Sequence, residues 1–100
     1  MAKKVILTPV AIANYQQIVK YLVEDWNDKV AEEFIQIFEV KANRLGDNPQ
    51  IYPFADEGKN IRRCVLTKHN TIYFKETEKV IRILMVFDTR QNPSKLRKLL

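Results

Sequence analysis

The chain has 100 residues, 46% of them hydrophobic and 10% aromatic, and its 17 lysines and arginines outnumber its 12 aspartates and glutamates. These values are typical of one globular domain spanning residues 1–100, and they exclude a disordered chain and a disulfide scaffold. The only cysteine, Cys64, has no disulfide partner and the N-terminus does not resemble a secretory signal, so we expect a cytoplasmic protein. No apolar run approaches the roughly 20 residues that span a bilayer, which argues against a membrane role. The net charge of +5 favours an anionic partner, either a nucleic acid or an acidic protein.

The first elements are a strand and a helix. A β-branched run at residues 3–8 predicts the strand. Thr8 and Pro9 predict the helix start, because threonine caps helices and proline is favoured at the first helical position. An apolar stripe at steps of three and four residues follows, so one side of this helix is expected to pack. The stripe consists of Ala11, Tyr15, Ile18, Leu22 and Trp26, widened by Ile12, Val19 and Val23.

A second helix is predicted from the cap pair Asn27-Asp28 to Leu45, where Gly46 is a stop signal. Only about two residues join the two helices, so we expect an antiparallel hairpin. The apolar positions of this second helix are Ala31, Phe34, Ile35, Phe38, Ala42 and Leu45.

The second half of the chain changes to strand-like patterns. After a loop at residues 49–60, β-branched and aromatic runs at 61–67, 71–75 and 79–89 are separated by short polar connections. Such connections allow only an antiparallel meander. The sequence therefore predicts an α+β fold with both helices on one face of the sheet. Residues 93–100 are compatible with either a short basic helix or a loose tail.

Alternation along the last strand predicts which face meets the helices. The wholly apolar row is expected to pack against them, and it consists of Ile81, Ile83, Met85 and Phe87. The opposite row consists of Val80, Arg82, Leu84, Val86 and Asp88.

A turn at Thr77-Glu78 would place Phe74 opposite Ile81 and Tyr73 opposite Arg82. The helix-free face would then be cationic and would carry an aromatic ring. Its members are Tyr73, Arg82, Asp88 and one of Arg62 or Arg63, with Arg90 just beyond the rim. We predict the functional site on this face.

The sequence contains none of the short motifs that bind nucleotide phosphates, hold catalytic zinc or position a nucleophilic serine. We therefore expect neither a metal nor a cofactor. Because His69 is the only histidine, an enzyme built on this chain would transfer protons mainly through arginine, lysine, tyrosine, aspartate or His69. RNA cleavage through the 2′-hydroxyl is one of the few reactions for which this suffices, since orientation and cationic stabilisation of a phosphate supply much of the rate.

Each candidate also has a purely structural interpretation. Exposed arginines discourage the pairing of sheet edges. Tyr73 can be a cross-strand packing partner, and His69 can be a solvated turn residue. Asp88 can form an ion pair with Arg90 or Arg82.

The whole sequence resembles the RelE/ParE superfamily of bacterial type II toxins, which includes plasmid stabilisation proteins. The resemblance rests on the order of elements and on the segments LGDNPQIYP, RRCVLTKHNTIYF and ILMVFDTRQNP. It implies a helical hairpin on an antiparallel sheet and a growth-inhibiting toxin that a cognate antitoxin holds inactive. The antitoxin is expected to be an extended acidic chain, which suits the basic surface.

The RelE-like branch of the superfamily cleaves mRNA in the ribosomal A site. In this branch, Arg62 or Arg63 matches the basic position of the second strand, and Arg90 matches the arginine after the fourth. Two positions depart from the pattern: an arginine is missing early in the third strand, at Asn70-Thr71, and Leu96 stands where a tyrosine is expected. The set of catalytic residues expected for an endoribonuclease is therefore incomplete.

We expect the following roles if the chain is an mRNA interferase. Four residues are assigned to catalysis, namely Arg90, Arg63, Arg82 and Tyr73, with Tyr73, His69 or Lys68 supplying proton transfer. Four more are assigned to binding of nucleic acid or target, namely Arg62, Lys68, His69 and Asp88. ParE-like members instead poison DNA gyrase and need no nuclease residues. We expect mRNA cleavage, with gyrase poisoning as the alternative and a non-toxic basic binding module as a third interpretation.

Overall fold

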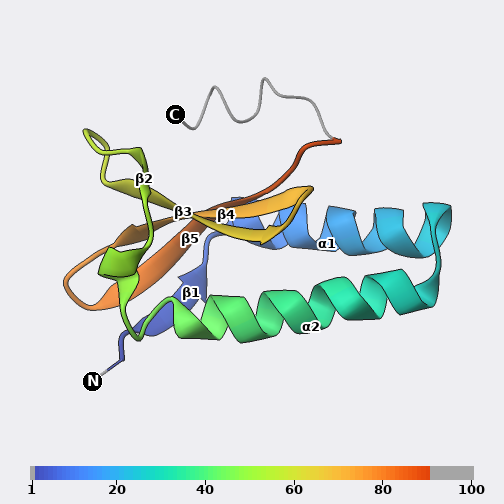
Figure 1. The fold of residues 1–100 in the computed structure, drawn as a ribbon, viewed down its shortest axis with the longest axis horizontal. Coiled ribbons are helices and arrows are strands. Elements are labelled where there is room, and N and C mark those ends of the chain that lie inside the picture. The colour runs from blue at the N-terminus through green and yellow to red at the C-terminus, as the bar shows by residue number, and fades with distance from the viewer. Residues whose placement is uncertain (1, 91–100) are drawn as a thin grey trace.

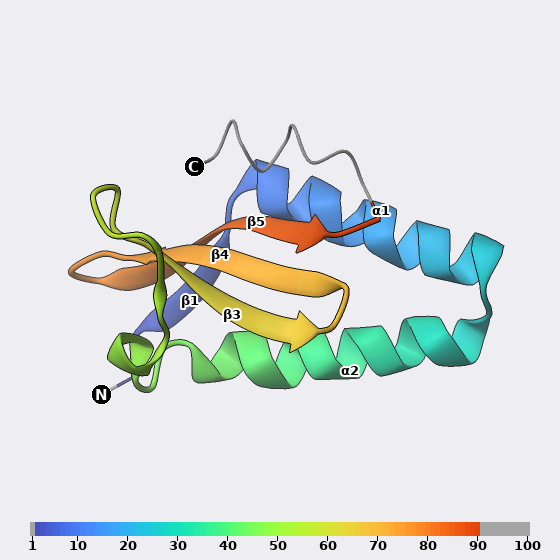
Figure 2. The ribbon, with the colours of Figure 1, turned by 45° about the horizontal axis from the view of Figure 1, so that its top comes forward.

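The computed structural model describes residues 2–90 and has the predicted α+β architecture. The expectations for residues 93–100, including Leu96, lie outside this range. Two antiparallel helices lie against one face of a five-stranded sheet (Figures 1 and 2). The elements are β1 (Lys4–Leu7), α1 (Pro9–Asp25), α2 (Asp28–Arg44), the 3-10 turn η1 (Pro49–Ile51), β2 (Phe54–Asp56), β3 (Ile61–Thr67), β4 (Asn70–Glu76) and β5 (Val80–Asp88).

The predicted helix caps are confirmed. The Thr8 hydroxyl accepts a hydrogen bond from the Ala11 N–H at 3.2 Å, with proline at the first position of α1. The Asn27 side-chain oxygen accepts a bond from the Val30 N–H at 2.9 Å at the start of α2. These bonds satisfy amide groups that have no partner inside a helix, so the hairpin is specified locally by the sequence.

Gly46 allows the end of the hairpin to approach β1. Its carbonyl accepts a hydrogen bond from the Lys3 N–H at 3.0 Å, and a Cβ at this position would collide with the Lys3 carbonyl oxygen. We expect Gly46→Ala to lower the free energy of unfolding by about 1–3 kcal/mol, because backbone must move to relieve the overlap. Urea denaturation followed by circular dichroism measures this loss.

Gly58→Ala is the matched control for this prediction. A Cβ at Gly58 would lie at an ordinary 3.5 Å from an Asp56 carboxylate oxygen. That variant should be as stable as the native chain or slightly more stable, since alanine restricts the unfolded chain. Equal stability of the two alanine variants would contradict the role given to Gly46.

The strand order of the sheet is β1-β5-β4-β3-β2. Strands β3, β4 and β5 form the predicted antiparallel meander, and β1 pairs with β5 in parallel. These two parallel strands cannot be joined by a tight turn, and the chain between them forms the helical hairpin and then β2, β3 and β4. Strand β2 lies within the segment predicted as a loop, and Phe54 pairs with Arg62.

The predicted register of the last hairpin is wrong. Phe74 lies opposite Ile83 and Tyr73 opposite Met85, so the ladder shifts at this point and Leu84 is an extra residue in β5. A β-bulge of this kind reverses the alternation of side chains beyond it. Ile81 and Ile83 pack on the helices as predicted. Beyond the bulge the prediction is wrong: Val86 belongs to the main core on the helix side, whereas Met85 and Phe87 lie in a second cluster on the other face.

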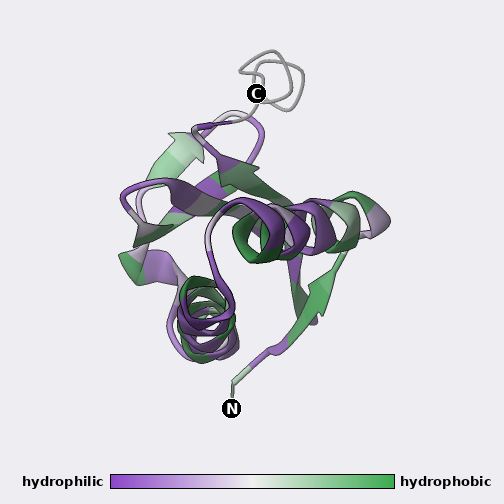
Figure 3. Ribbon diagram, turned by 90° about the vertical axis from the view of Figure 1, so that its right-hand side faces the viewer, coloured by the Kyte–Doolittle hydropathy of each residue, from purple (hydrophilic) through white to green (hydrophobic). Residues whose placement is uncertain are grey.

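The main core fills the space between the helices and the sheet. Its fully buried members include Ile18, Leu45, Phe74 and Ile83. Figure 3 looks along the helices and shows hydrophobic and hydrophilic residues on different sides of each. A second, smaller cluster consists of Ile61, Tyr73, Met85 and Phe87.

The apolar stripe of α1 differs from the prediction at several positions. Trp26, Val23 and Ile12 are 58%, 46% and 44% exposed, although the spacing predicts them on the packed side. Asn14 is buried instead, and its side-chain oxygen accepts a hydrogen bond from the Val86 N–H at 3.2 Å. A polar side chain is stable there because its oxygen has a backbone partner beside the bulge.

Candidate functional site

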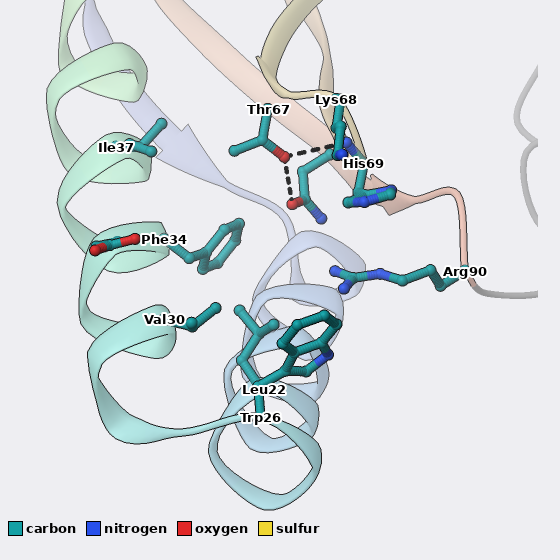
Figure 4. Close-up of a pocket in the computed structure, with 11 residues that line it drawn as sticks. Leu22, Trp26, Val30, Phe34, Ile37, Thr67, Lys68, His69 and Arg90 are labelled. Carbon is teal, nitrogen blue, oxygen red and sulfur yellow. Dashed lines mark hydrogen bonds between the residues drawn. The ribbon is translucent and has the colours of Figure 1, made fainter.

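A pocket of about 380 Å³ opens between the helical hairpin and the β3–β4 turn (Figure 4). We call it the helix–turn pocket. The helices supply one side, formed by Leu22, Trp26, Val30, Glu33, Phe34 and Ile37. The turn and the end of β5 supply the other, formed by Thr67, Lys68, His69, Asn70 and Arg90.

The helical side of the pocket is mainly apolar. Leu22 and Phe34 are buried at its base, whereas Trp26 stands exposed at the tip of the hairpin. The Trp26 indole N–H donates a hydrogen bond to the Tyr21 hydroxyl at 3.3 Å, which fixes the ring. A large aromatic surface next to a hollow is typical of a site that binds a protein or peptide.

The turn side is polar and held in place by hydrogen bonds. The Thr67 hydroxyl donates to the Asn70 side-chain oxygen at 2.8 Å and accepts from the His69 N–H at 3.2 Å. The His69 ring Nδ1 lies 3.3 Å from the Thr89 hydroxyl, and the Thr89 N–H donates to the His69 carbonyl at 2.8 Å. Residues of the turn are therefore tied to the segment that follows β5.

Asn70 contributes a buried donor to the pocket lining. The residue is 4% exposed, and its side-chain nitrogen has no hydrogen-bond partner within residues 2–90. A buried amide N–H without an acceptor is costly, and such groups occur where a ligand or ordered water completes the structure.

Arg90 is held by Asp88 in a two-pronged ion pair. Its Nε and Nη2 donate to the two carboxylate oxygens of Asp88, each at 2.9 Å, and its backbone N–H donates to the same carboxylate at 2.9 Å. The hydrogen bonds with Asp88 raise the pKa of Arg90 above its ordinary value. The guanidinium carbon lies 4.9 Å from the centre of the Tyr21 ring.

The predicted place of Asp88 on the helix-free face is therefore wrong. The Asp88 side chain is 2% exposed and that of Arg90 is 25% exposed. The bulge at Leu84 shifts the alternation, so Asp88 follows Val86 toward the helices and meets Arg90 there. The prediction that Arg90 lies beyond the rim of the helix-free face is corrected in the same way, since Arg90 lines the helix–turn pocket.

The helix-free face carries three of the predicted residues, but they do not form one exposed site. Arg63 pairs with Tyr73, whereas Arg82 pairs with Lys75 nearer the other end of the strands. Tyr73 is 8% exposed within the second cluster, and this burial raises the pKa of its hydroxyl. The expectation of an open aromatic ring is therefore wrong, because the bulge brings Met85 beside Tyr73.

Arg62 has a structural role. Its Nη1 donates to the Tyr52 carbonyl at 2.6 Å, and its guanidinium carbon lies 3.9 Å from the centre of the Phe54 ring. It pairs with Phe74 of the main core, so it lies on the opposite face from Arg63. Of these two arginines, only Arg63 belongs to the helix-free face.

The structure thus separates the eight predicted residues into two groups. Lys68, His69 and Arg90 line the helix–turn pocket, where Asp88 holds Arg90, while Arg62, Arg63, Tyr73 and Arg82 do not line it. Sequence analysis missed Trp26 and Asn70. The position of Trp26 at the end of the first helix, immediately before the cap pair, could have indicated that it lies at the exposed tip of the hairpin.

No group of three or more histidine, cysteine, aspartate or glutamate residues within residues 2–90 could hold a metal ion. In the same range, neither helix has the length and apolar character that a membrane span requires.

Comparison with known proteins identifies the family. Residues 5–93 match the sequence model described as "ParE toxin of type II toxin-antitoxin system, parDE". The chain therefore belongs to the RelE/ParE superfamily of toxins, and within it to the ParE toxin family of type II toxin–antitoxin systems. A search of curated proteins finds no match.

Solved toxin structures confirm the fold. One, from the chromosomal ParDE system of P. aeruginosa, has a TM-score of 0.73 and 18% identity, covering 89% of this chain and 98% of that one. Another, from the E. coli DinJ-YafQ toxin–antitoxin complex, has a TM-score of 0.58 and 15% identity, covering 88% of this chain and 93% of that one. At these identities the similarity concerns the RelE/ParE-like fold alone.

Proposed function

We propose that this chain arrests growth by binding a protein target, DNA gyrase, and that it does not cleave RNA. Membership of the ParE toxin family favours gyrase as the target, and the engagement of Arg90 with Asp88 is the observation that argues against RNA cleavage. Both carboxylate oxygens of Asp88 are used by the guanidinium, so the pair carries no net charge toward a phosphate. A catalytic arginine would instead present its donors to the charge that develops in the transition state.

The other candidates for catalysis support the same conclusion. Tyr73 is buried with a raised pKa, so its hydroxyl stays protonated at neutral pH and is a poor general base. The Arg62 guanidinium already donates a hydrogen bond to the Tyr52 carbonyl. Arg63 and Arg82 remain exposed, but they lie opposite different residues of β4, Tyr73 and Lys75, and do not form one site.

The antitoxin is the partner that we assign to the helix–turn pocket. The apolar side, with Trp26 and Phe34, suits an apolar anchor residue, and Lys68 at the mouth suits acidic neighbours of that anchor. The unpartnered N–H of Asn70 would receive a backbone or side-chain acceptor of the bound chain. The toxin would then be inactive while this segment is bound.

RNA cleavage is the second candidate, favoured by one observation. Lys68 and His69 line the helix–turn pocket together with the paired guanidinium of Arg90, so an ammonium group and an imidazole face the same space (Figure 4). These are residue types that can orient a phosphate and transfer a proton.

Induction of the chain in bacteria separates the two mechanisms. We expect an SOS response and broken DNA before translation falls, and we expect purified chain to trap cleaved plasmid with purified gyrase. His69→Ala should leave the arrest intact, because on this proposal the imidazole takes part in no reaction. Rapid mRNA cleavage on ribosomes with intact DNA, abolished by His69→Ala, would establish the nuclease instead.

A further inference from the structure

The helix–turn pocket has the size and lining of a small-molecule site. Its volume is about 380 Å³, and its helical side is mostly aliphatic and aromatic, while the turn adds a few polar groups. Ligand sites in proteins are typically clefts of about 300–1,000 Å³ that combine apolar walls with a small number of polar groups in fixed positions. The hydrogen bonds from Thr67 to Asn70 and from His69 to Thr67 hold the polar groups here. The pocket is therefore formed before a ligand arrives.

The side chain of Asn70 defines what a ligand must carry. Its oxygen accepts a hydrogen bond from the Thr67 hydroxyl at 2.8 Å, so the nitrogen is the atom left for the pocket that Asn70 lines. This nitrogen has no acceptor within residues 2–90, and the residue is 4% exposed. A buried N–H without an acceptor costs free energy that a ligand oxygen recovers. The ligand therefore carries a hydrogen-bond acceptor at its polar end.

Lys68 indicates that this acceptor is an anion. It lies in the same turn, is exposed at the pocket lining and forms no ion pair within the described range 2–90. Glu33, which also lines the pocket, belongs to the helical side. A carboxylate at the turn accepts the N–H of Asn70 near an unpaired ammonium group, and hydrogen bonds to a charged acceptor are stronger than those to a neutral one.

The helical side of the pocket accepts an apolar body. Leu22 and Phe34 are buried at its base, and Trp26 adds a largely exposed indole ring (Figure 4). A phenyl ring or a short alkyl chain placed against these side chains removes apolar surface from water. A bare phosphate or sulfate ion would leave this surface hydrated. The walls therefore select an amphipathic ligand over a simple anion.

We propose that the helix–turn pocket binds a small amphipathic carboxylate, a molecule with one acid group and a short aromatic or aliphatic body. The carboxylate accepts the N–H of Asn70 and faces Lys68, and the body packs against Trp26, Phe34 and Leu22. Such a ligand fills the volume that the proposed function gives to the anchor residue of the antitoxin. It would therefore release the toxin from its antitoxin. This consequence rests on the proposed function, whereas the binding site rests on the pocket alone.

Phenylbutyrate is the probe, since it joins a phenyl ring to a carboxylate through a short alkyl chain. We expect saturable binding to isotope-labelled full-length chain made by cell-free synthesis, with a dissociation constant of about 0.05–2 mM for a ligand of this size. The side-chain amide signals of Asn70 should move downfield in the nitrogen–proton spectrum, because the N–H gains an acceptor. The fluorescence of Trp26 should change in the same titration, since its ring lines the pocket.

Phenylpropylamine is the matched control, because it carries an ammonium group on the same ring and chain. It offers no acceptor to Asn70 and is repelled by Lys68, so its affinity should be at least about tenfold lower. Equal or tighter binding of the amine would show that the pocket does not present a donor, and it would overturn the proposal. Saturable binding of phenylbutyrate that leaves the amide signals of Asn70 in place would do the same.

Two variants provide a second measurement. Asn70→Asp keeps the oxygen that accepts from Thr67 and replaces the donor by a second oxygen, so the affinity for phenylbutyrate should fall at least about tenfold. Asn43→Asp makes the same change of charge at an exposed position of α2 outside the pocket lining, and its affinity should equal that of the native chain. Lys68→Gln changes an exposed turn residue without disturbing the interior, and it should weaken binding by about two- to fivefold. Native affinity in both Asn70→Asp and Lys68→Gln would contradict the site.

Displacement of the antitoxin is a separate measurement. Phenylbutyrate added to the preformed complex should lower the apparent affinity of the antitoxin as the probe fills the pocket. Binding of the probe to the free chain without such displacement would support the ligand site and would contradict the assignment of the antitoxin to this pocket. Failure of the ligand site is thus distinguishable from failure of the proposed function.

Discussion

Arg90→Ala is expected to lower the free energy of unfolding by about 2–4 kcal/mol, because it leaves the carboxylate of Asp88 buried without its cation. Only the Arg90 backbone N–H would remain as a donor to that carboxylate. The loss stays below that of a fully buried pair, since a quarter of the Arg90 side chain is exposed. Urea denaturation of the variant at neutral pH measures it.

Two further variants show whether the loss of stability comes from the missing hydrogen bonds or from the unpaired carboxylate. Arg90→Lys keeps the charge but cannot form both bonds to Asp88, so its loss should be intermediate. Adding Asp88→Asn to Arg90→Ala should recover part of the loss, because an amide is easier to bury than a carboxylate. Native stability of Arg90→Ala alone would show that the pair does not stabilise the fold. Loss of toxicity in that variant would then point to a contact between Arg90 and the target.

Trp26→Ala is expected to weaken binding of the antitoxin by roughly 30- to 1,000-fold, because aromatic anchors of this kind contribute about 2–4 kcal/mol. The ring is mostly exposed in the free chain, so stability should change by less than about 0.5 kcal/mol. Calorimetric titration with the cognate antitoxin measures the affinity.

Val23→Ala is the matched control for Trp26→Ala. Val23 is also exposed on α1, at 46%, but it does not line the helix–turn pocket. The affinity of the Val23→Ala variant for the antitoxin should equal that of the native chain. Trp26 is the only tryptophan, so its fluorescence also reports entry of an apolar residue into the pocket. Native affinity of Trp26→Ala, or no spectral change on binding, would place the antitoxin elsewhere.

The sequence predicted the elements whose signals are local. Thr8 and Asn27 each cap a helix through their own side chains, and Gly46 lies where the chain must approach Lys3 closely. The three long strands were found from their β-branched and aromatic runs, which are intrinsically suited to a pleated sheet. Strand β2 was missed because three residues within a turn-rich segment carry no periodicity.

The candidate site was predicted less well because it depends on one bulge. Both rows of β5 are mostly apolar, so the sequence does not show which residue is extra. The partner that accommodates the bulge is Asn14, far away in the chain, whose side chain binds the Val86 N–H. The shift of the alternation by one residue turned Asp88 away from the expected face, and Arg90, which pairs with it, lines the pocket.

Trp26 illustrates a second limit of periodicity. The helical spacing correctly predicts Ala11, Ile18 and Leu22 in the core, but α1 reaches beyond the strands that cover it (Figure 2). At the tip of the hairpin the same side of the helix has no sheet to pack against. Spacing gives the direction of a side chain, whereas burial depends on the length of the neighbouring element.

A continuous row of contacts crosses from the sheet to the hairpin tip. Asp88 binds Arg90, the guanidinium lies over Tyr21, and the Tyr21 hydroxyl accepts from the Trp26 indole. These contacts restrict the side chains before a partner binds, so under the proposed binding mode association costs less rotational freedom on the toxin side. Most of the entropic cost of binding would then come from ordering the antitoxin, and the rate at which the antitoxin folds should limit how quickly the complex forms.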